Sequence, residues 1–433
     1  VEDRYGPGAG APSPLKASMR TDFLDDESWS VEALTTSEHR AYFQMLRAGP
    51  RETLYFDPKD SSSCAAVVTC GGISPGENNA IREIFMTLRR YGVERIFGIK
   101  DGFQGILARA NWVEMSDDYV QNIHQRGGTI LKTRRGHPDH AEAAKVLQEN
   151  GVRQLFVLGG DGSLRGALQM ATALAGVNHS CACLAIPATI NNDIPLVDRT
   201  FGFDTACTVA RDSLTAAYVE ATCNANCIGM VKLAGMHSGF LALESTLAAR
   251  NVDICLLPEM DIALEKVLDH CETLMGAKGY AVIAVSDGCT RSLFKDLGGP
   301  AEDMDIGPWL KDQVLARFKE KKKPLTIKYI DPTYTVRSEK ANAFDSHYGA
   351  VLAEHAVHGA MAGLTGVFVS KVNERNVYLP LQVLSKLSRR SVCLSGRWFA
   401  RMLFTTRQPR FEPEGFAYPA PDESTAQSLR ELS

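Results

Sequence analysis

The chain has 433 residues, enough for about two or three domains, and its hydrophobic content of 45% and charged content of 23% are ordinary for a globular protein. Its formal net charge of −4 argues against a broad nucleic-acid-binding surface, and no apolar run approaches the roughly 18 residues that a membrane span needs. Its 11 cysteines, an odd number scattered through apolar segments, indicate a reducing compartment rather than a disulfide scaffold. We therefore expect no nucleic-acid partner and no membrane span.

The N-terminal part of the chain carries few structural signals. Residues 1–20 are rich in Gly, Pro and Ala and are expected to be disordered, and residues 21–60 are expected to form an irregular, partly helical extension. The chain starts at Val1 rather than at a methionine, which predicts that it has been processed or trimmed. We expect a cytoplasmic protein, and the alternative is a plastid or another organelle after removal of a targeting segment.

From Cys64 onward, short apolar runs alternate with amphipathic stretches. Strands are predicted at residues 65–69, 95–99, 155–158, 181–186, 227–233, 253–257 and 280–285, and helices at residues 79–90, 139–150 and 348–361. Such alternation is typical of βαβ units, so the predicted fold class is α/β with parallel sheets whose faces are covered. Ligands bind beyond the carboxyl ends of strands in such sheets, and that is where the polar clusters of this chain fall.

The first three of these clusters are loops that contain glycines. Residues 69–78, with Gly72, lie between a strand and a helix and suit a phosphate, although a tight turn without a ligand is the alternative. Residues 100–105 carry Phe103, which is either a base-stacking ring or a core residue. Residues 127–136 hold Arg135 in a glycine-bounded loop, which suits a polyphosphate or is a plain surface loop.

Two further clusters end predicted strands that should lie side by side. The first is Gly-Gly-Asp-Gly-Ser at residues 159–163, where Asp161 is a candidate ligand for the Mg²⁺ of a bound nucleotide. The second is the loop of residues 189–193, which has the form of a catalytic loop. It carries an amide, Asn191, where a carboxylate would be expected.

In this order and context, the clusters resemble the phosphofructokinase family, and in particular its ATP-dependent, plant-type branch. The resemblance extends over roughly residues 51–411. Beyond the glycine clusters at 71–78 and 159–163, it is carried by Tyr-Phe-Asp-Pro at 55–58, Phe-Gly-Phe-Asp-Thr-Ala at 201–206, Leu-Pro-Glu at 257–259, Tyr-Ile-Asp-Pro-Thr-Tyr at 329–334, and the segments 358–363 and 397–401.

The resemblance implies a phosphofructokinase-like fold of two Rossmann-like, parallel-sheet α/β domains with the active site in the cleft between them. Residues 61–205 plus about 340–378 would form the nucleotide-binding domain. Residues 206–339 plus about 379–411 would form the sugar-phosphate-binding domain, and residues 1–60 and 412–433 an extension and a tail. Family members are dimers or tetramers with sites completed across interfaces, so a homo- or hetero-oligomer is implied.

The resemblance also implies a reaction, in which the γ-phosphoryl group of ATP, with Mg²⁺, passes to the 1-hydroxyl of fructose 6-phosphate. The implied nucleotide ligands are Gly72, Phe103, Arg135, Gly160, Gly162 and Ser163, the implied metal ligand is Asp161, and the implied sugar-phosphate ligands are Thr189, Asp193, Gly235, Met236, Glu259, Tyr334 and Arg337. Arg135 matches an arginine that bridges the phosphates of the two substrates. Gly162 favours ATP, because the pyrophosphate-dependent branch has an aspartate there.

Several positions depart from the family pattern. Asn191 stands where the family has the aspartate that accepts the proton of the attacking hydroxyl, and an amide cannot act as that base. Met236 replaces an arginine aimed at the sugar phosphate or at transition-state charge, and Ala188 replaces a lysine. Lys132 and Arg134 replace two small residues. Asp193, the second acid of the loop, is retained.

These departures lie in separate loops that face one cleft, whereas the glycines and apolar strands are kept. We therefore expect a catalytically impaired family member. The alternatives are a non-catalytic regulatory or structural subunit of a larger assembly, a fully active kinase in which Asp193 or a water takes the proton, and a kinase for another sugar phosphate.

Overall fold

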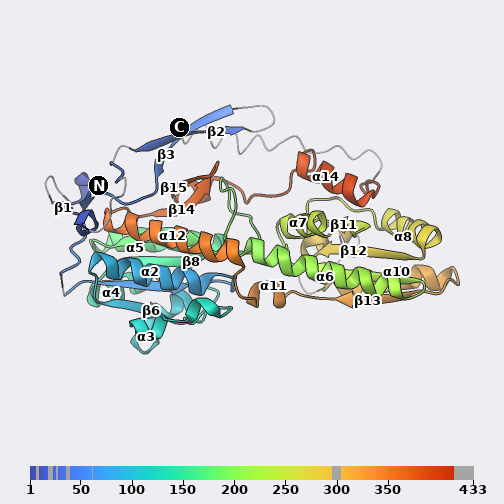
Figure 1. Ribbon diagram of the computed structural model, residues 1–433, viewed down its shortest axis with the longest axis horizontal. Coiled ribbons are helices and arrows are strands. Elements are labelled where there is room, and N and C mark those ends of the chain that lie inside the picture. Colours follow the sequence, from blue (N-terminus) through green and yellow to red (C-terminus); the bar gives the residue numbers. More distant parts are fainter. Residues whose placement is uncertain are drawn as a thin grey trace.

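The computed structural model describes residues 1–5, 9–17, 23–25, 28–35, 40–60, 62–294 and 304–413. The expected C-terminal tail lies, from residue 414 on, outside the described residues, and so do parts of the N-terminal stretch that is expected to be disordered. The described residues form two α/β halves that lie next to each other along the long axis of the molecule (Figure 1).

The first half is built on a sheet of nine described strands. In spatial order they are β2 (Trp29–Thr35), β3 (Arg40–Arg47), β15 (Arg375–Pro380), β14 (Val367–Val372), β9 (Ala182–Pro187), β8 (Val152–Gly159), β5 (Cys64–Thr69), β6 (Ile96–Ile99) and β7 (Trp112–Glu114). The strands from β14 to β6 are parallel, and the outer strands pair antiparallel. Every residue of β5 and β9 is buried, as expected for parallel strands covered on both faces.

Helices cover both faces of this sheet. The main ones are α2 (Glu77–Tyr91), α4 (His140–Glu149), α5 (Asp161–Gly176) and α12 (Ala343–Met361). Alternate residues of β5 point to opposite faces: Val67 packs in one cluster with α2 and α12, and Val68 packs in another with α4 and α5. This alternation sets α2 and α12 on one side of the sheet and α4 and α5 on the other.

The second half has a four-stranded parallel sheet in the order β11 (Ile254–Leu256), β12 (Tyr280–Ser286), β10 (Cys227–Leu233) and β13 (Thr326–Ile330). Its longer helices are α6 (Phe203–Cys223), α7 (Phe240–Ala249), α8 (Leu264–Lys278), α10 (Ile306–Glu320) and α14 (Arg397–Thr406). These helices share one hydrophobic core with the sheet. The chain returns to the first half for β14 and β15 and then crosses back to α14, which packs on α7 (Figure 1).

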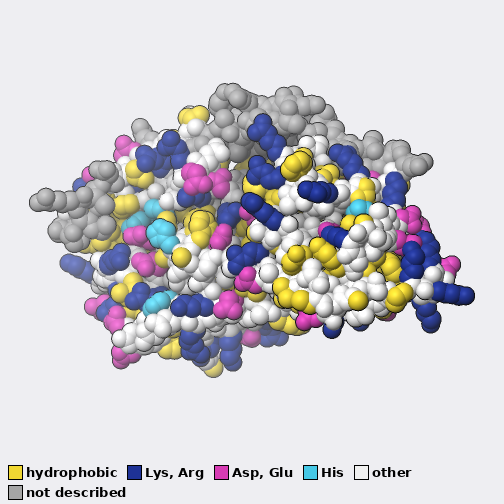
Figure 2. Space-filling view, turned by 45° about the vertical axis from the view of Figure 1, so that its right-hand side comes forward, with side chains coloured by type: hydrophobic (Ala, Val, Ile, Leu, Met, Phe, Trp, Pro, Cys, Tyr) yellow, Lys and Arg dark blue, Asp and Glu magenta, His cyan; other side chains and the backbone are white. Residues whose placement is uncertain are grey.

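The remaining described elements are short. They are α1 (Glu2–Tyr5), α3 (Asp117–Val120), α9 (Thr290–Leu293), α11 (Thr335–Ser338) and α13 (Val383–Lys386), with β1 (Ala11–Pro12) paired to β4 (Thr53–Leu54). None of the helices in the described part of the chain is long and apolar enough to cross a membrane. On the face shown in Figure 2, basic and acidic side chains are interspersed over both halves rather than gathered by sign.

All seven predicted strands and all three predicted helices are present, with ends shifted by a few residues. The expectation for residues 21–60 was wrong, because β2 and β3 form there and extend the first sheet. β3 pairs antiparallel with β15 at Arg47 and Val377. An open sheet edge recruits a strand through its free backbone groups, and this partner lies far away in the sequence.

Candidate active site

A cleft of about 670 Å³ lies where the carboxyl ends of strands from both sheets meet. Its residues follow β5, β8 and β9 of the first sheet and β10, β12 and β13 of the second. They are Cys70, Gly71, Gly72, Ile73, Phe103, Arg134, Arg135, Gly136, His137, Gly160, Asp161, Gly162, Ser163, Ala188, Thr189, Ile190, Asn191, Asp193, Ala234, Gly235, Met236, His237, Asp287, Thr333, Arg337 and Arg389.

The cleft contains nearly all the residues that the sequence singles out. Only Glu259 and Tyr334, of the expected ligands, are not among its lining residues. Glu259 is half-buried, and Oε1 accepts hydrogen bonds from the backbone N–H groups of Gly239 (2.9 Å) and Val392 (2.7 Å). Tyr334 is 76% exposed, and the guanidinium carbon of Arg337 lies 4.8 Å from its ring centre.

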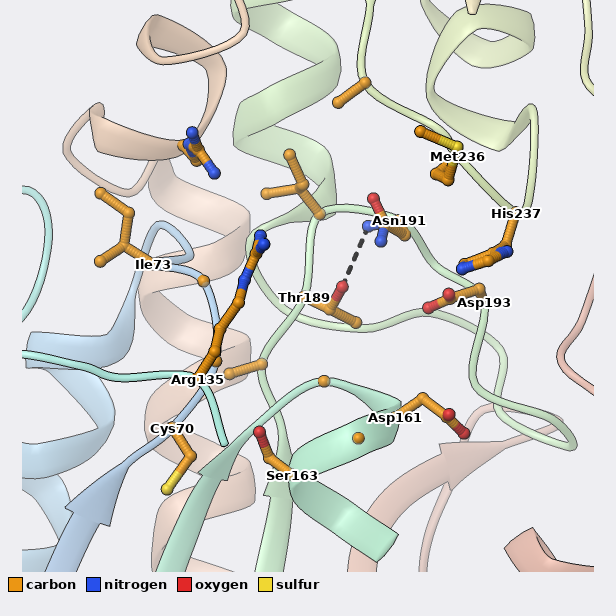
Figure 3. Close-up of a pocket in the computed structure, with 18 of the residues that line it drawn as sticks. Cys70, Ile73, Arg135, Asp161, Ser163, Thr189, Asn191, Asp193, Met236 and His237 are labelled. Atoms are coloured by element: carbon orange, nitrogen blue, oxygen red, sulfur yellow. Dashed lines mark hydrogen bonds between the residues drawn. The ribbon is translucent and has the colours of Figure 1, made fainter. Parts of the chain in front are cut away.

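The loop after β5 is joined to the arginine loop of residues 131–136. The N–H of Gly71 donates to the carbonyl of Arg134 (3.1 Å), and Oγ1 of Thr133 donates to the carbonyl of Gly71 (3.0 Å). The guanidinium of Arg134 pairs with Asp101 at 3.0 Å. Arg135, in contrast, extends into the middle of the cleft (Figure 3). One of the two extra cations is therefore held by an acid, and the expected bridging arginine points to where substrates would lie.

The turn between β8 and α5 leaves room above a helix N-terminus. A Cβ on Gly159 would lie 2.4 Å from Oγ of Ser163, so this close approach requires glycine. A Cβ on Gly162 would meet no atom within 4 Å. Because α5 begins at Asp161, its first N–H groups and its positive dipole end face this open space, and they favour an anion there.

Asp161 is engaged by two arginines. Its side chain is 4% exposed, and Nε of Arg165, one helical turn along α5, lies 3.2 Å from Oδ1 and 3.1 Å from Oδ2. Nε of Arg389 lies 3.1 Å from Oδ2. Nη1 of Arg389 also lies 3.9 Å from a carboxylate oxygen of Asp193. The two acids of the site thus share one guanidinium group.

The loop after β9 holds Asn191 in a fixed turn. The N–H of Asn191 donates to Oγ1 of Thr189 at 3.2 Å (Figure 3), and its carbonyl accepts from Oγ of Ser238 at 3.1 Å. The neighbouring Asn192 has a φ of 53°, and its Oδ1 accepts from the N–H of Thr200. The loop is therefore held by hydrogen bonds of its backbone and of Asn192, and the side chain of Asn191 faces the cleft.

Asp193 is the remaining acid of this loop and is 2% exposed. Burial raises the pKa of its carboxyl, and the charge of Arg389 partly offsets this rise. A raised pKa makes a carboxylate a stronger base, but this one lies beside the guanidinium of Arg389, which also contacts Asp161.

The loop after β10 presents Met236 and His237 (Figure 3). Gly235 has a φ of 150°, and a Cβ there would lie 2.4 Å from Oγ of Ser286, so glycine is required. Nη2 of Arg291 lies 2.5 Å from Nδ1 of His237. Since arginine can only donate, Nδ1 accepts, and the neutral ring carries its proton on Nε2. Burial, together with Arg389 and Arg291, lowers the pKa of His237.

Phe103 lines the cleft but is 1% exposed. Its ring centre lies 5.5 Å from that of His137 and 6.2 Å from that of His140. The two imidazoles stack on each other at 5.5 Å. Phe103 therefore forms one side of an aromatic group of three rings, in which His137 also lines the cleft.

Sequence reasoning missed several lining residues. Asp287 follows β12, and the strand-end rule would have found it; burial raises its pKa to about 6. His237 lies next to Met236 in a loop that was already singled out. His137 and Arg389 had no local signal, and Arg389 comes from the segment between α13 and α14.

Two α/β halves with glycine turns and arginines at facing strand ends define a protein built to bind phosphate groups. The chain belongs to the phosphofructokinase family: the family model described as Phosphofructokinase matches residues 64–360. It is 41% identical over 422 residues to ATP-dependent 6-phosphofructokinase 1 of Arabidopsis thaliana, covering 92% of this chain and 88% of that protein. It is 39% identical to ATP-dependent 6-phosphofructokinase of Amycolatopsis methanolica, covering 84% and 82%.

Solved structures agree on the fold. Pyrophosphate-dependent phosphofructokinase from Marinobacter aquaeolei superposes with a TM-score of 0.67 at 18% identity, covering 82% of this chain and 94% of that one. Pichia pastoris phosphofructokinase in the T-state superposes with a TM-score of 0.63 at 20% identity, covering 87% and 40%. The predicted fold class and family are confirmed.

Proposed function

We propose that this chain binds ATP and fructose 6-phosphate in the cleft and transfers the phosphoryl group poorly. The observation that carries this proposal is Asn191, which occupies a hydrogen-bonded catalytic loop without the carboxylate that the loop is built to present. General-base catalysis contributes typically ~10²–10⁴-fold to a rate, so its loss alone makes a kinase slow.

Nucleotide binding is supported by groups that remain in place. The open space above Gly162, the N-terminus of α5 and the side chain of Arg135 all suit a polyphosphate. A Cβ on Gly72 would lie 4.0 Å from Nη1 of Arg337, so this arginine adds positive charge beside the first glycine loop.

Weak phosphoryl transfer is also supported by a second missing group, in addition to the missing carboxylate at Asn191. Met236 offers an apolar thioether where the family has an arginine, so a cation that would stabilise developing charge is missing. Asp193 is the acid nearest in sequence to Asn191, but it is buried and lies beside Arg389. It is therefore a poor substitute for the missing base.

We assign the nucleotide to the half with the larger sheet (residues 61–205 plus about 340–378) and the sugar phosphate to the other half (residues 206–339 plus about 379–411). We also propose a dimer or tetramer, because Arg337 lines the cleft and Tyr334, whose ring it contacts, is exposed, so that a second chain could complete the site there. Two relatives from Arabidopsis thaliana are named chloroplastic. For this chain, a cytoplasmic or a plastid location stays a prediction.

A second candidate function is a non-catalytic regulatory or structural subunit. It is favoured because the cleft keeps its phosphate-binding groups but lacks two others. Asn191 stands where a carboxylate is expected, and Met236 stands where an arginine is expected. Such a subunit would bind substrates or effectors and act on active partner chains.

A coupled assay with fructose 6-phosphate, ATP and Mg²⁺ tests these proposals. We expect turnover at least ~10²-fold below the median enzyme value of about 10 s⁻¹. Turnover near that median would overturn impairment. Turnover with only another sugar phosphate would assign a different acceptor, and no turnover, with altered kinetics of an added active relative, would support the regulatory subunit.

A further inference from the structure

The surroundings of Asp161 do not suit a magnesium ion. Mg²⁺ is bound by one or two free carboxylates, waters and substrate phosphates in near-octahedral geometry. Both carboxylate oxygens of Asp161 already accept hydrogen bonds from Arg165, and Oδ2 also accepts one from Arg389.

We propose that Arg389, held by Asp161, takes the place of the divalent cation, so that the chain binds the polyphosphate of a nucleotide without Mg²⁺. This inference rests on the proposed nucleotide site. It adds that the ligand of this site is the metal-free nucleotide rather than its magnesium complex. Arg165 has the supporting role: it neutralises Asp161 from the next turn of α5, and Arg389 lines the cleft.

Charge balance supports this assignment. Asp161 and Asp193 together would offer two negative charges to a dication, but Arg165 and Arg389 bring two positive charges to the same place. The side chain of Asp161 is almost fully buried behind these two guanidinium groups, so a metal ion could reach its oxygens only if an arginine moved away.

Arg389 is also placed to bind phosphate itself. Its side chain is 37% exposed, and it contacts Asp161 through Nε, at one edge of a planar group with five N–H donors. Arginine binds phosphate oxygens through two parallel hydrogen bonds. In other nucleotide sites a metal ion contacts these oxygens in place of an arginine. Together with Arg135 and Arg337, Arg389 gives the cleft three cationic side chains for a ligand with a high negative charge.

The test is isothermal titration calorimetry of the purified full chain with ATP, once in EDTA and once in excess MgCl₂. We expect metal-free ATP to bind at least as tightly as the magnesium complex. The Arg389→Gln variant should bind metal-free ATP at least about tenfold more weakly, because it loses a charge-assisted contact. Arg211→Gln is the matched control, since Arg211 pairs with Asp212 on the surface of α6.

A second measurement uses Mn²⁺ alone, detected by electron paramagnetic resonance. We expect no bound Mn²⁺ in the wild type and one bound ion in the Arg165→Gln/Arg389→Gln double variant, in which Asp161 and Asp193 are released. The wild-type calorimetry needs no variant, so it stays decisive if the double variant fails to fold.

The outcomes separate this inference from the proposed function. If ATP binds the wild type only with Mg²⁺, the nucleotide site stands and the arginine substitution is wrong. If ATP binds under neither condition, the proposed nucleotide site fails, and this inference fails with it. If the wild type and Arg389→Gln preferred metal-free ATP over its magnesium complex to the same degree, the role given to Arg389 would also be wrong.

Discussion

Nε of Arg389 lies 3.1 Å from Oδ2 of Asp161, although the two residues are 228 positions apart in the chain. Arg389 belongs to the segment by which the chain leaves β15 and returns to the second half, and Asp161 begins the helix that follows β8. The ion pair therefore joins two segments that both line the cleft. It also makes the site's charge depend on a residue outside the glycine loops.

The first prediction concerns the missing base. Asn191→Asp should raise kcat by about 10²-fold or more, because it restores a proton acceptor in a loop whose hydrogen bonds through Thr189 and Ser238 use only the backbone of residue 191. The coupled assay with fructose 6-phosphate and ATP measures this gain. The kcat of Asn191→Asp should stay below that of a family member with both the aspartate and the arginine, because Met236 is unchanged.

Asn192→Asp is the matched control for this substitution. It adds the same charge one residue away, at a φ of 53° that Asp tolerates, and its Oδ1 can still accept from the N–H of Thr200. No gain in kcat is expected there. An equal gain in both variants would mean that added charge, rather than a base at residue 191, raises the rate.

A second prediction concerns the sugar phosphate. Met236→Arg should tighten binding of fructose 6-phosphate about 10- to 100-fold, the range expected for a hydrogen bond to a charged group worth about 1.5–3 kcal/mol. Met236 is 43% exposed in the cleft, so a longer side chain has room. Calorimetric titration with fructose 6-phosphate measures the change, and Met236→Gln, which is polar but uncharged, is the control. Unchanged affinity would show that the 6-phosphate lies elsewhere.

A third prediction concerns the nucleotide. Gly162→Asp should lower ATP affinity at least about tenfold, because it places a negative charge where phosphate would lie. The melting temperature of this variant should stay close to that of wild type, since a Cβ at residue 162 meets nothing within 4 Å. Gly162→Ala adds the Cβ alone and should bind ATP normally. If Gly162→Ala weakened binding as much as Gly162→Asp, crowding rather than charge would be responsible.

The fold could largely be predicted because its signals are local. Residues 64–69 and 154–159 are continuous buried runs followed by glycine turns, which mark covered parallel strands without any knowledge of their neighbours. β2 and β3 could not be predicted in this way. β2 pairs with β3, and β3 pairs with β15, which lies more than 300 residues further along the chain (Arg47 with Val377); strand preference depends on such partners.

The candidate site shows the same division. Asp161, Asn191 and Met236 follow strands in sequence, so rules for strand ends find them. The pairing of Asp161 with Arg165 and Arg389 depends on which of several arginines the fold brings to the cleft, and sequence spacing does not carry that information. For the same reason the hydrogen bonds that Glu259 accepts from the N–H groups of Gly239 and Val392 could not be read from its place in the sequence.

The last prediction concerns stability and pH. Glu77, the first residue of α2, is fully buried; Oε1 accepts from the N–H of Ser74, and Oε2 has no hydrogen-bond partner among the described residues. Burial raises the pKa of its carboxyl to about 8, so the folded state holds this proton more tightly than the unfolded chain and loses stability as the pH rises from about 4.5 to about 8. Glu77→Gln keeps the acceptor for Ser74 and removes the titration. Its stability relative to wild type, measured by urea unfolding, should therefore be similar at pH 5 and higher at pH 8. An advantage of equal size at both pH values would show that the titration of Glu77 is not its source.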